Sequence, residues 1–127
     1  MAKTSHDLVL EAKSQIREVD PGAAQALIAA GAVVLDVREP MEFAAGHLPG
    51  ALNIPRGMLE FRFAATPELT QTARPIVVYC KTSGRAALAT VALQQMGVDT
   101  AVSLAGGFDA WAEAGLQIDQ PAPVDFE

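Results

Sequence analysis

The chain has few of the residues that would cross-link it, bind a metal or hold it in a membrane. Its 127 residues include a single cysteine, Cys80, so an internal disulfide is excluded, and two histidines with one cysteine are a poor set of metal ligands. No apolar run approaches the roughly 20 residues that a membrane span needs. The first residues lack the apolar segment and cleavage site of a signal peptide. We therefore expect a cytoplasmic protein in a reducing compartment, with no bound metal.

Basic residues are also scarce, and they are unevenly placed. The formal net charge is −6, which argues against nucleic acid as a partner. No Lys or Arg follows Arg85, and most basic residues lie around the cysteine: Arg38, Arg56, Arg62, Arg74, Lys81 and Arg85. An acidic protein that keeps its cations around its only thiol is suited to attract a small anion. Chance clustering of surface charge explains the same pattern equally well.

Short apolar segments alternate with helical ones along most of the chain. Strands are expected over residues 33–37, 51–54, 75–79 and 101–104, with a short extended stretch near Val19. Helices are expected over about residues 6–16, 21–30, 40–45, 57–64, 86–95 and 108–114, and residues 66–74 are expected to be a polar connection. This alternation predicts one domain with a parallel α/β sheet that is covered by helices on both faces.

Cys80 stands where a buried strand is expected to end and a helix to begin. Ligands of parallel sheets bind beyond the carboxyl ends of the strands, and Asp36 occupies a second such end. Lys81, Arg85 and the free N–H groups of the turn favour a thiolate, which is the reactive form of cysteine. Gly84 leaves the concave side of the turn open. An ordinary buried cysteine is the alternative, but the strand-end position with two cations favours the reactive one.

Four motifs, in order, resemble those of the rhodanese (sulfurtransferase) family. They are residues 36–43 and 46–55, which are similar to its two opening signatures, residues 75–85, similar to its active-site strand and loop, and residues 104–111, similar to its closing signature. The resemblance implies a five-stranded parallel sheet flanked by helices, and no cofactor. It divides the chain into an N-terminal helical extension (1–16), the rhodanese domain (17–118) and an extended C-terminal tail (119–127).

The resemblance also implies a thiosulfate sulfurtransferase with a double-displacement reaction. Cys80 would attack the outer sulfur of a donor such as thiosulfate, expel sulfite and hold the sulfur as a persulfide. A thiol, cyanide or a protein cysteine would then accept it. The loop would bind the donor through Lys81, Thr82, Ser83, Gly84 and Arg85.

Two other functions compete with this one. A small domain with an exposed loop lacks obvious walls for a small substrate, so the chain could be a persulfide carrier or sulfur-binding adaptor for a protein partner. Related phosphatase loops carry five residues between the cysteine and the arginine, whereas this chain has four. The shorter loop argues against phosphatase or arsenate reductase activity.

Several residues near the motifs have weaker claims to a role. Asp36 is expected to hydrogen-bond the loop or Arg38, and not to act as a base, because a carboxylate near Cys80 opposes thiolate formation. Arg56 and, less so, Arg62 are candidates for lining the pocket, with solvated surface as the alternative. A structural hydrogen bond is favoured for His47, and packing for Phe108 and Trp111. Whether the N-terminal helix packs on the core or mediates self-association is left open, as is the oligomeric state.

Overall fold

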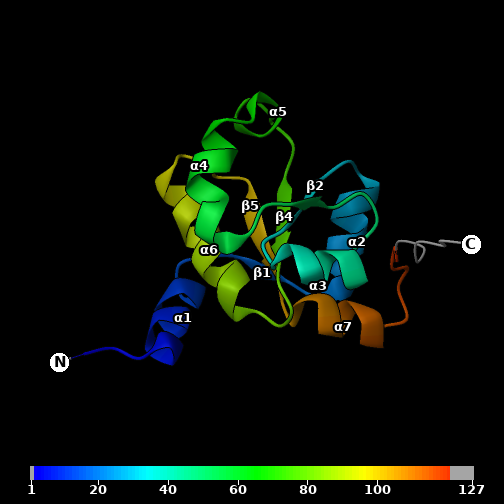
Figure 1. Ribbon diagram of the computed structural model, residues 1–127, viewed down its shortest axis with the longest axis horizontal. Coiled ribbons are helices and arrows are strands. Elements are labelled where there is room, and N and C mark those ends of the chain that lie inside the picture. Colours follow the sequence, from blue (N-terminus) through cyan, green and yellow to red (C-terminus); the bar gives the residue numbers. More distant parts are fainter. Residues whose placement is uncertain (1, 121–127) are drawn as a thin grey trace, which may run out of the picture.

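A five-stranded parallel sheet forms the centre of the molecule, as predicted (Figure 1). The computed structural model of the chain describes residues 2–120. The strands lie in the order β1-β5-β4-β2-β3. Their bounds are β1 (Glu18–Val19), β2 (Val33–Asp36), β3 (Leu52–Asn53), β4 (Ile76–Tyr79) and β5 (Ala101–Leu104).

Helices cover both faces of the sheet. Figure 1 shows α4 and α6 on one side and α2 and α7 on the other. The helices are α1 (Ser5–Lys13), α2 (Pro21–Ala29), α3 (Pro40–Ala45), α4 (Leu59–Ala64), α5 (Pro67–Thr70), α6 (Gly84–Gln95) and α7 (Gly107–Glu113), with a 3₁₀ turn η1 (Arg56–Met58) before α4. Successive residues of a strand face opposite sides. Thus Val78 and Cys80 join the core beneath α4 and α6, whereas Val77 and Tyr79 join the core beneath α2 and α7.

Local chemistry accounts for several helix boundaries. Thr4 caps α1 in a reciprocal pair with Asp7, and the carboxylate of Asp20 accepts a hydrogen bond from the N–H of Ala23 at the start of α2. Pro21 occupies the first turn of α2, where its missing N–H costs nothing. No helix within residues 2–120 combines the length and the apolar character that crossing a membrane requires.

The structure corrects the sequence-based elements at a few points. Residues 66–74 are not only a polar connection, because they contain α5, which buries Leu69. Four residues are too few to show a helical period. The first helix ends at Lys13, and α6 begins at Gly84, two residues earlier than expected. The expected C-terminal tail is described only at residues 119–120, where Asp119 pairs with His47, and residues 121–127 lie outside the described part.

Candidate active site

Sheet register brings the ends of β2 and β4 together. Asp36 and Tyr79 are paired residues of these two strands, so Cys80 emerges beside the end of β2. Cys80 is a free thiol and only 1% exposed. Its Sγ accepts a hydrogen bond from the backbone N–H of Ala86, in the first turn of α6, at 3.4 Å. The sulfur therefore lies inside the loop, next to the first turn of α6.

The loop after Cys80 is held by the first turn of α7. The carbonyl of Cys80 accepts from the N–H of Phe108 at 2.8 Å, and the carbonyl of Lys81 accepts from the N–H of Asp109 at 3.1 Å. In a trans peptide the N–H points opposite to the C=O, so the N–H groups of Lys81 and Thr82 point away from α7. The backbone N–H groups of residues 81–85 make no hydrogen bond to any other residue within 2–120. The loop therefore offers a set of free donors.

Gly107 allows this close approach between α7 and the loop. A Cβ at this position would lie 2.3 Å from the carbonyl oxygen of Thr82, 2.5 Å from that of Cys80 and 2.7 Å from that of Lys81. The backbone is also left-handed here, with φ of +59°. From the sequence, Gly107 belongs only to the motif over residues 104–111, so the part that it plays in shaping the loop was missed.

Arg85 lies in an ion pair that the sequence analysis did not anticipate. Its Nη1 and Nη2 donate to Oε1 and Oε2 of Glu42, on α3, at 2.7 and 3.0 Å. The hydrogen bond from Arg85 lowers the pKa of Glu42 to about 2, and Glu42 in turn raises the pKa of Arg85, with weaker contributions from Cys80 and Asp36. The only signal for Glu42 was its position in the first turn of a short helix, where an acid suggests capping. It does accept a hydrogen bond from the N–H of Glu39.

Lys81 is also paired. Its Nζ donates to Oδ2 of Asp109 at 2.7 Å, but both side chains are well exposed, at 60% and 42%. Thus each of the two cations that were expected to attract an anion already has an acidic partner from another element. Thr82 is exposed, and Ser83 and Gly84 are partly buried.

Asp36 and Arg38 form a buried pair beside the site. The guanidinium of Arg38 makes three hydrogen bonds of 2.8–3.1 Å to the carboxylate of Asp36 and donates to the carbonyl of Gly46 at 2.7 Å. It also lies 4.6 Å from the ring centre of Phe108 and 5.4 Å from that of Tyr79. Burial disfavours this charge, but the hydrogen bonds and charge of Asp36 outweigh it and raise the pKa of Arg38. The pair ties β2 to α7 and to the end of α3.

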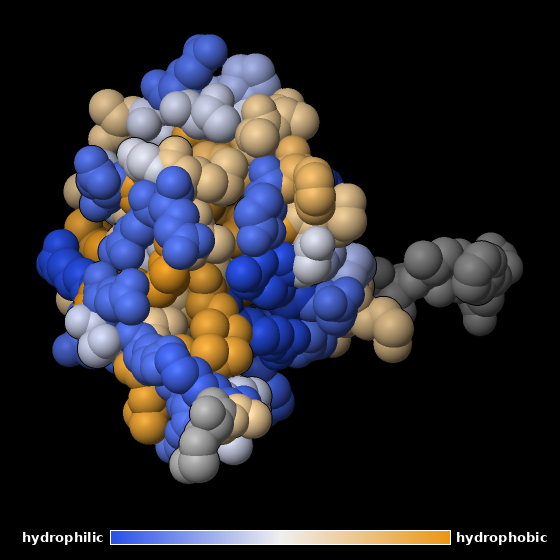
Figure 2. Space-filling model, turned by 90° about the vertical axis from the view of Figure 1, so that its left-hand side faces the viewer, coloured by the Kyte–Doolittle hydropathy of each residue, from blue (hydrophilic) through white to orange (hydrophobic). Residues whose placement is uncertain are grey.

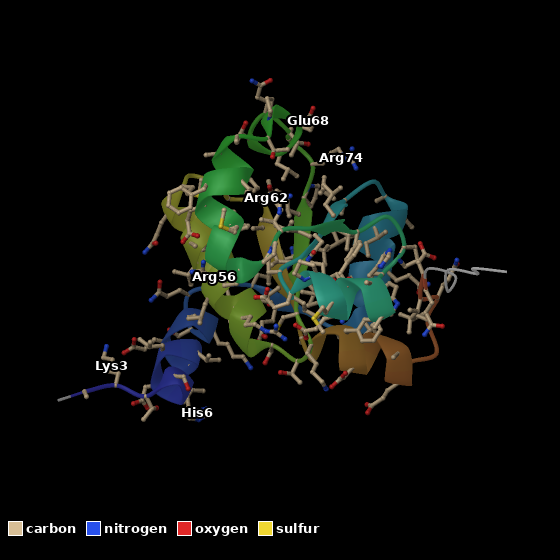
Figure 3. The ribbon with its side chains drawn as sticks, in the orientation of Figure 1. Lys3, His6, Arg56, Arg62, Glu68 and Arg74 are labelled. Atoms are coloured by element: carbon tan, nitrogen blue, oxygen red, sulfur yellow. The ribbon has the colours of Figure 1, made fainter. Side chains whose placement is uncertain are left out.

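Arg56 lies on a different surface. It forms an ion pair with Glu60 at 3.1 Å and lines a groove of about 410 Å³ between α1, α4 and α6. Figure 2 shows this side of the molecule, with an apolar hollow bordered by hydrophilic side chains. Figure 3 shows Arg56 and Arg62 along the η1–α4 segment. None of residues 80–85 lines this groove. The structure therefore does not bring Arg56 into the group of residues around Cys80.

The N-terminal helix packs on α6 and touches the loop. Ala12 is buried, and the carbonyl of Gln15 accepts from the side chain of Gln94 at 3.2 Å. A Cβ on Gly84 would lie 3.4 Å from Cγ2 of Val9, so α1 contacts the turn that carries the free N–H groups.

Three other side chains that the sequence analysis weighed have structural contacts. His47 stacks on Phe43, and its Nδ1 lies 2.9 Å from that residue's carbonyl oxygen. Trp111 is buried and donates to the carbonyl of Gln117 at 2.8 Å, and Phe108 packs on the same core. Within residues 2–120, no three His, Cys, Asp or Glu side chains gather in a way that would hold a metal ion.

Known proteins resemble the chain over most of its length. A family model described as the rhodanese-like domain matches residues 20–114. A sulfurtransferase of Allochromatium vinosum is 35% identical over 89 residues, which are 70% of this chain and 79% of that protein. The thiosulfate sulfurtransferase GlpE of Haemophilus influenzae is 32% identical over 104 residues, 81% of this chain and 94% of that protein.

A solved structure from Rhodopseudomonas palustris is similar in both fold and sequence. It has a TM-score of 0.85 and 34% identity, and the match covers 94% of this chain and 96% of that one. That protein is described as having unknown function and as a possible tyrosine phosphatase. The fold and the family expected from the sequence are thus confirmed.

Proposed function

The chain belongs to the family of rhodanese-like domains and is related to sulfurtransferases; on that premise we propose that it transfers sulfane sulfur from thiosulfate or a similar donor through a persulfide on Cys80. The observation that carries the proposal is the position of the Cys80 Sγ beside a loop whose N–H groups have no partner among residues 2–120. Such donors stabilise a thiolate and the terminal sulfur of a persulfide.

The reaction has two balanced steps. In the first, the Cys80 thiolate bonds to the outer sulfur of thiosulfate, the S–S bond of the donor breaks, and its electron pair leaves on sulfite. Cys80 then carries a second sulfur with a negative charge. In the second, cyanide, a thiol or a protein cysteine attacks that sulfur, and Cys80 is released as a thiolate. No metal or organic cofactor takes part in either step.

The loop residues have separate tasks in this scheme. The N–H groups of Lys81, Thr82, Ser83, Gly84 and Arg85 face the bound sulfur. The Asp36–Arg38 pair, with its buried hydrogen bonds, holds the end of β2 and the start of α7 in place and does not exchange a proton with Cys80. Arg56 is assigned no part, because it pairs with Glu60 on another groove.

A persulfide carrier or adaptor is the second candidate. Lys81 and Thr82 are exposed, so a protein partner can reach the turn directly. In this case the acceptor is a cysteine of the partner, and turnover of thiosulfate is incidental. We also propose a cytoplasmic setting, because the cytoplasm keeps a reactive thiol reduced. We also propose that residues 17–118 are the transfer domain, preceded by a helical extension (1–16) and followed by a tail (119–127).

Phosphate-ester hydrolysis is less well supported. The R. palustris protein is described as a possible tyrosine phosphatase. In this chain, four residues separate Cys80 from Arg85, and Glu42 holds both terminal nitrogens of the guanidinium that would bind a phosphoryl group.

The test is the mass of the intact protein before thiosulfate, after it, and after cyanide. A gain of about 32 Da, the mass of one sulfur, that cyanide removes and that the Cys80→Ser variant lacks supports the persulfide cycle. A Cys80→Ser protein that is folded and still transfers sulfur would overturn it. A parallel assay with p-nitrophenyl phosphate separates the phosphatase alternative, since turnover that depends on Cys80 would favour that function.

A further inference from the structure

The charges around the loop cancel. Arg85 is paired with Glu42, and Lys81 with Asp109. The two acids come from α3 and α7, so they are not part of the loop itself. A doubly charged donor that approaches Cys80 therefore meets cations that already have partners.

The two pairs differ in strength. Asp109 and Lys81 share a single contact and are widely exposed, so water and salt screen them. Glu42 accepts hydrogen bonds from Arg85 through both carboxylate oxygens, and its side chain is 31% exposed. The N–H of Glu39 donates a further hydrogen bond to the same carboxylate. Arg–carboxylate pairs with two parallel hydrogen bonds are among the stronger ionic contacts. Glu42 is therefore the acid that sets the state of Arg85.

We infer that Glu42 determines donor specificity: by occupying the guanidinium of Arg85, it makes the site favour sulfur donors with one negative charge or none, such as the persulfide of a small thiol, over the doubly charged thiosulfate. This inference rests on the proposed sulfur transfer through Cys80. It deepens that function by naming the class of donor.

The reason is competition for one set of donors. The sulfonate end of thiosulfate would need the same fork of N–H groups that the Glu42 carboxylate occupies. A sulfonate that displaced the carboxylate would also stand beside its negative charge. The persulfide of a small uncharged thiol has no oxyanion end, so it needs only the N–H groups of the turn, and those are free within the described residues.

The step with a persulfide is also balanced. The Cys80 thiolate bonds to the outer sulfur of R–S–SH, the S–S bond of the donor breaks, and the electron pair leaves on the thiolate R–S⁻. Cys80 is left with an –SH group on its sulfur. The net charge of the reactants, one negative, is the net charge of the products.

The experiment compares two donors in three proteins. We expect Glu42→Gln to raise kcat/KM for thiosulfate about tenfold, mainly through a lower KM. The reason is that Arg85 can then donate a charge-assisted hydrogen bond to the donor, and the free energy of one such bond corresponds to a factor of about ten in binding. The rate with the persulfide of 2-mercaptoethanol, a thiol without a charged group, is expected to stay about the same. Glu68→Gln is the matched control, because it removes the same charge from α5, at the far end of the molecule (Figure 3). Its ratio of thiosulfate to persulfide activity should equal that of the unaltered protein.

A second readout separates specificity from a merely structural role. Sulfate should inhibit Glu42→Gln more strongly than the unaltered protein, while Glu42→Asp, which keeps the charge, should resemble the latter. An unchanged or higher KM for thiosulfate in Glu42→Gln, or an equal loss with both donors, would overturn the inference. Its failure differs from a failure of the proposed function, in which neither donor adds sulfur to Cys80 of the unaltered protein.

Discussion

Gly107 gives the most direct test of how the loop is built, because an added methyl group there would strike the backbone around Cys80. The atoms that a Cβ would meet are the carbonyl oxygens of Thr82, Cys80 and Lys81, at 2.3, 2.5 and 2.7 Å. These are backbone atoms, so no rotation of a side chain relieves the overlap. Gly107→Ala must therefore push α7 away from the loop.

The cost follows from the contacts that would be lost. A non-glycine residue in left-handed backbone costs about 1 kcal/mol or slightly more. Separating α7 from the loop also breaks the hydrogen bonds from Phe108 to Cys80 and from Asp109 to Lys81, each with a net value of about 1 kcal/mol. We expect Gly107→Ala to lower the free energy of unfolding by about 3 kcal/mol.

Gly115 provides a matched control at the other end of the same helix. Its φ is +75°, but a Cβ there would meet nothing within 4 Å. Gly115→Ala should therefore carry only the backbone cost, about 1 kcal/mol. Urea unfolding of both variants isolates the effect of the overlap. Equal losses in the two variants would refute the argument that Gly107 is needed for the contact with the loop.

The same pair of variants connects the loop to the chemistry. Once the carbonyls of Cys80 and Lys81 lose their partners on α7, the N–H groups that follow them lose their common direction. A displacement of about 1 Å at a reacting centre costs about 100-fold in rate. We therefore expect the rate of persulfide formation to fall about 100-fold in Gly107→Ala and to stay unchanged in Gly115→Ala. The rate is measured by mass spectrometry of the intact protein, at a temperature where both variants are folded.

Two further predictions concern the ion pairs. Asp36→Asn leaves the charge of Arg38, which is 4% exposed, without its partner, and should lower the free energy of unfolding by about 3–5 kcal/mol. The double variant Asp36→Leu/Arg38→Met, which removes both charges, should lower it clearly less. An equal or larger decrease in the double variant would contradict the importance of the buried pair. The pKa of Glu42 is about 2 in the folded protein against an ordinary 4.5. A lowered pKa means that the pair stabilises the fold fully above about pH 4.5 and that this contribution disappears as the pH falls toward 2. Stability measured across that window should be flatter in Glu42→Gln, and identical slopes in the two proteins would count against the pair.

The parts of the site that could be predicted are those that local sequence determines. The run of β-branched residues before Cys80 and the Ala-rich segment after Arg85 predict a buried strand and a helix, and the structure has β4 and α6 there. Asp36 and Cys80 were both expected at the carboxyl ends of parallel strands, and the pairing of β2 with β4 places these two ends side by side. The hydrogen bonds between Asp36 and Arg38 are likewise short-range, only two residues apart.

The partners of the loop cations could not be predicted, because they depend on distant elements. Glu42 precedes Arg85 by 43 residues, and Asp109 follows Lys81 by 28. Each acid lies in the first turn of a short helix, where an acid suits the dipole, so its position along the chain does not point to an ion pair with the loop. The surroundings of Arg56 were equally hard to predict, since the groove it lines is created by the packing of α1 on α6.

The backbone geometry of the loop and the charge around it are set by different parts of the molecule. The direction of the N–H groups around Cys80 comes from α7, through Gly107 and two backbone hydrogen bonds. The charge available to a donor comes from side chains on α3 and α7. If the proposed sulfur transfer holds, we expect a change at Glu42 to alter which donor is attracted without moving the backbone around Cys80. A change at Gly107 is expected to slow transfer from every donor. Comparing the two variants with thiosulfate and with a persulfide distinguishes selection of the donor from the transfer itself.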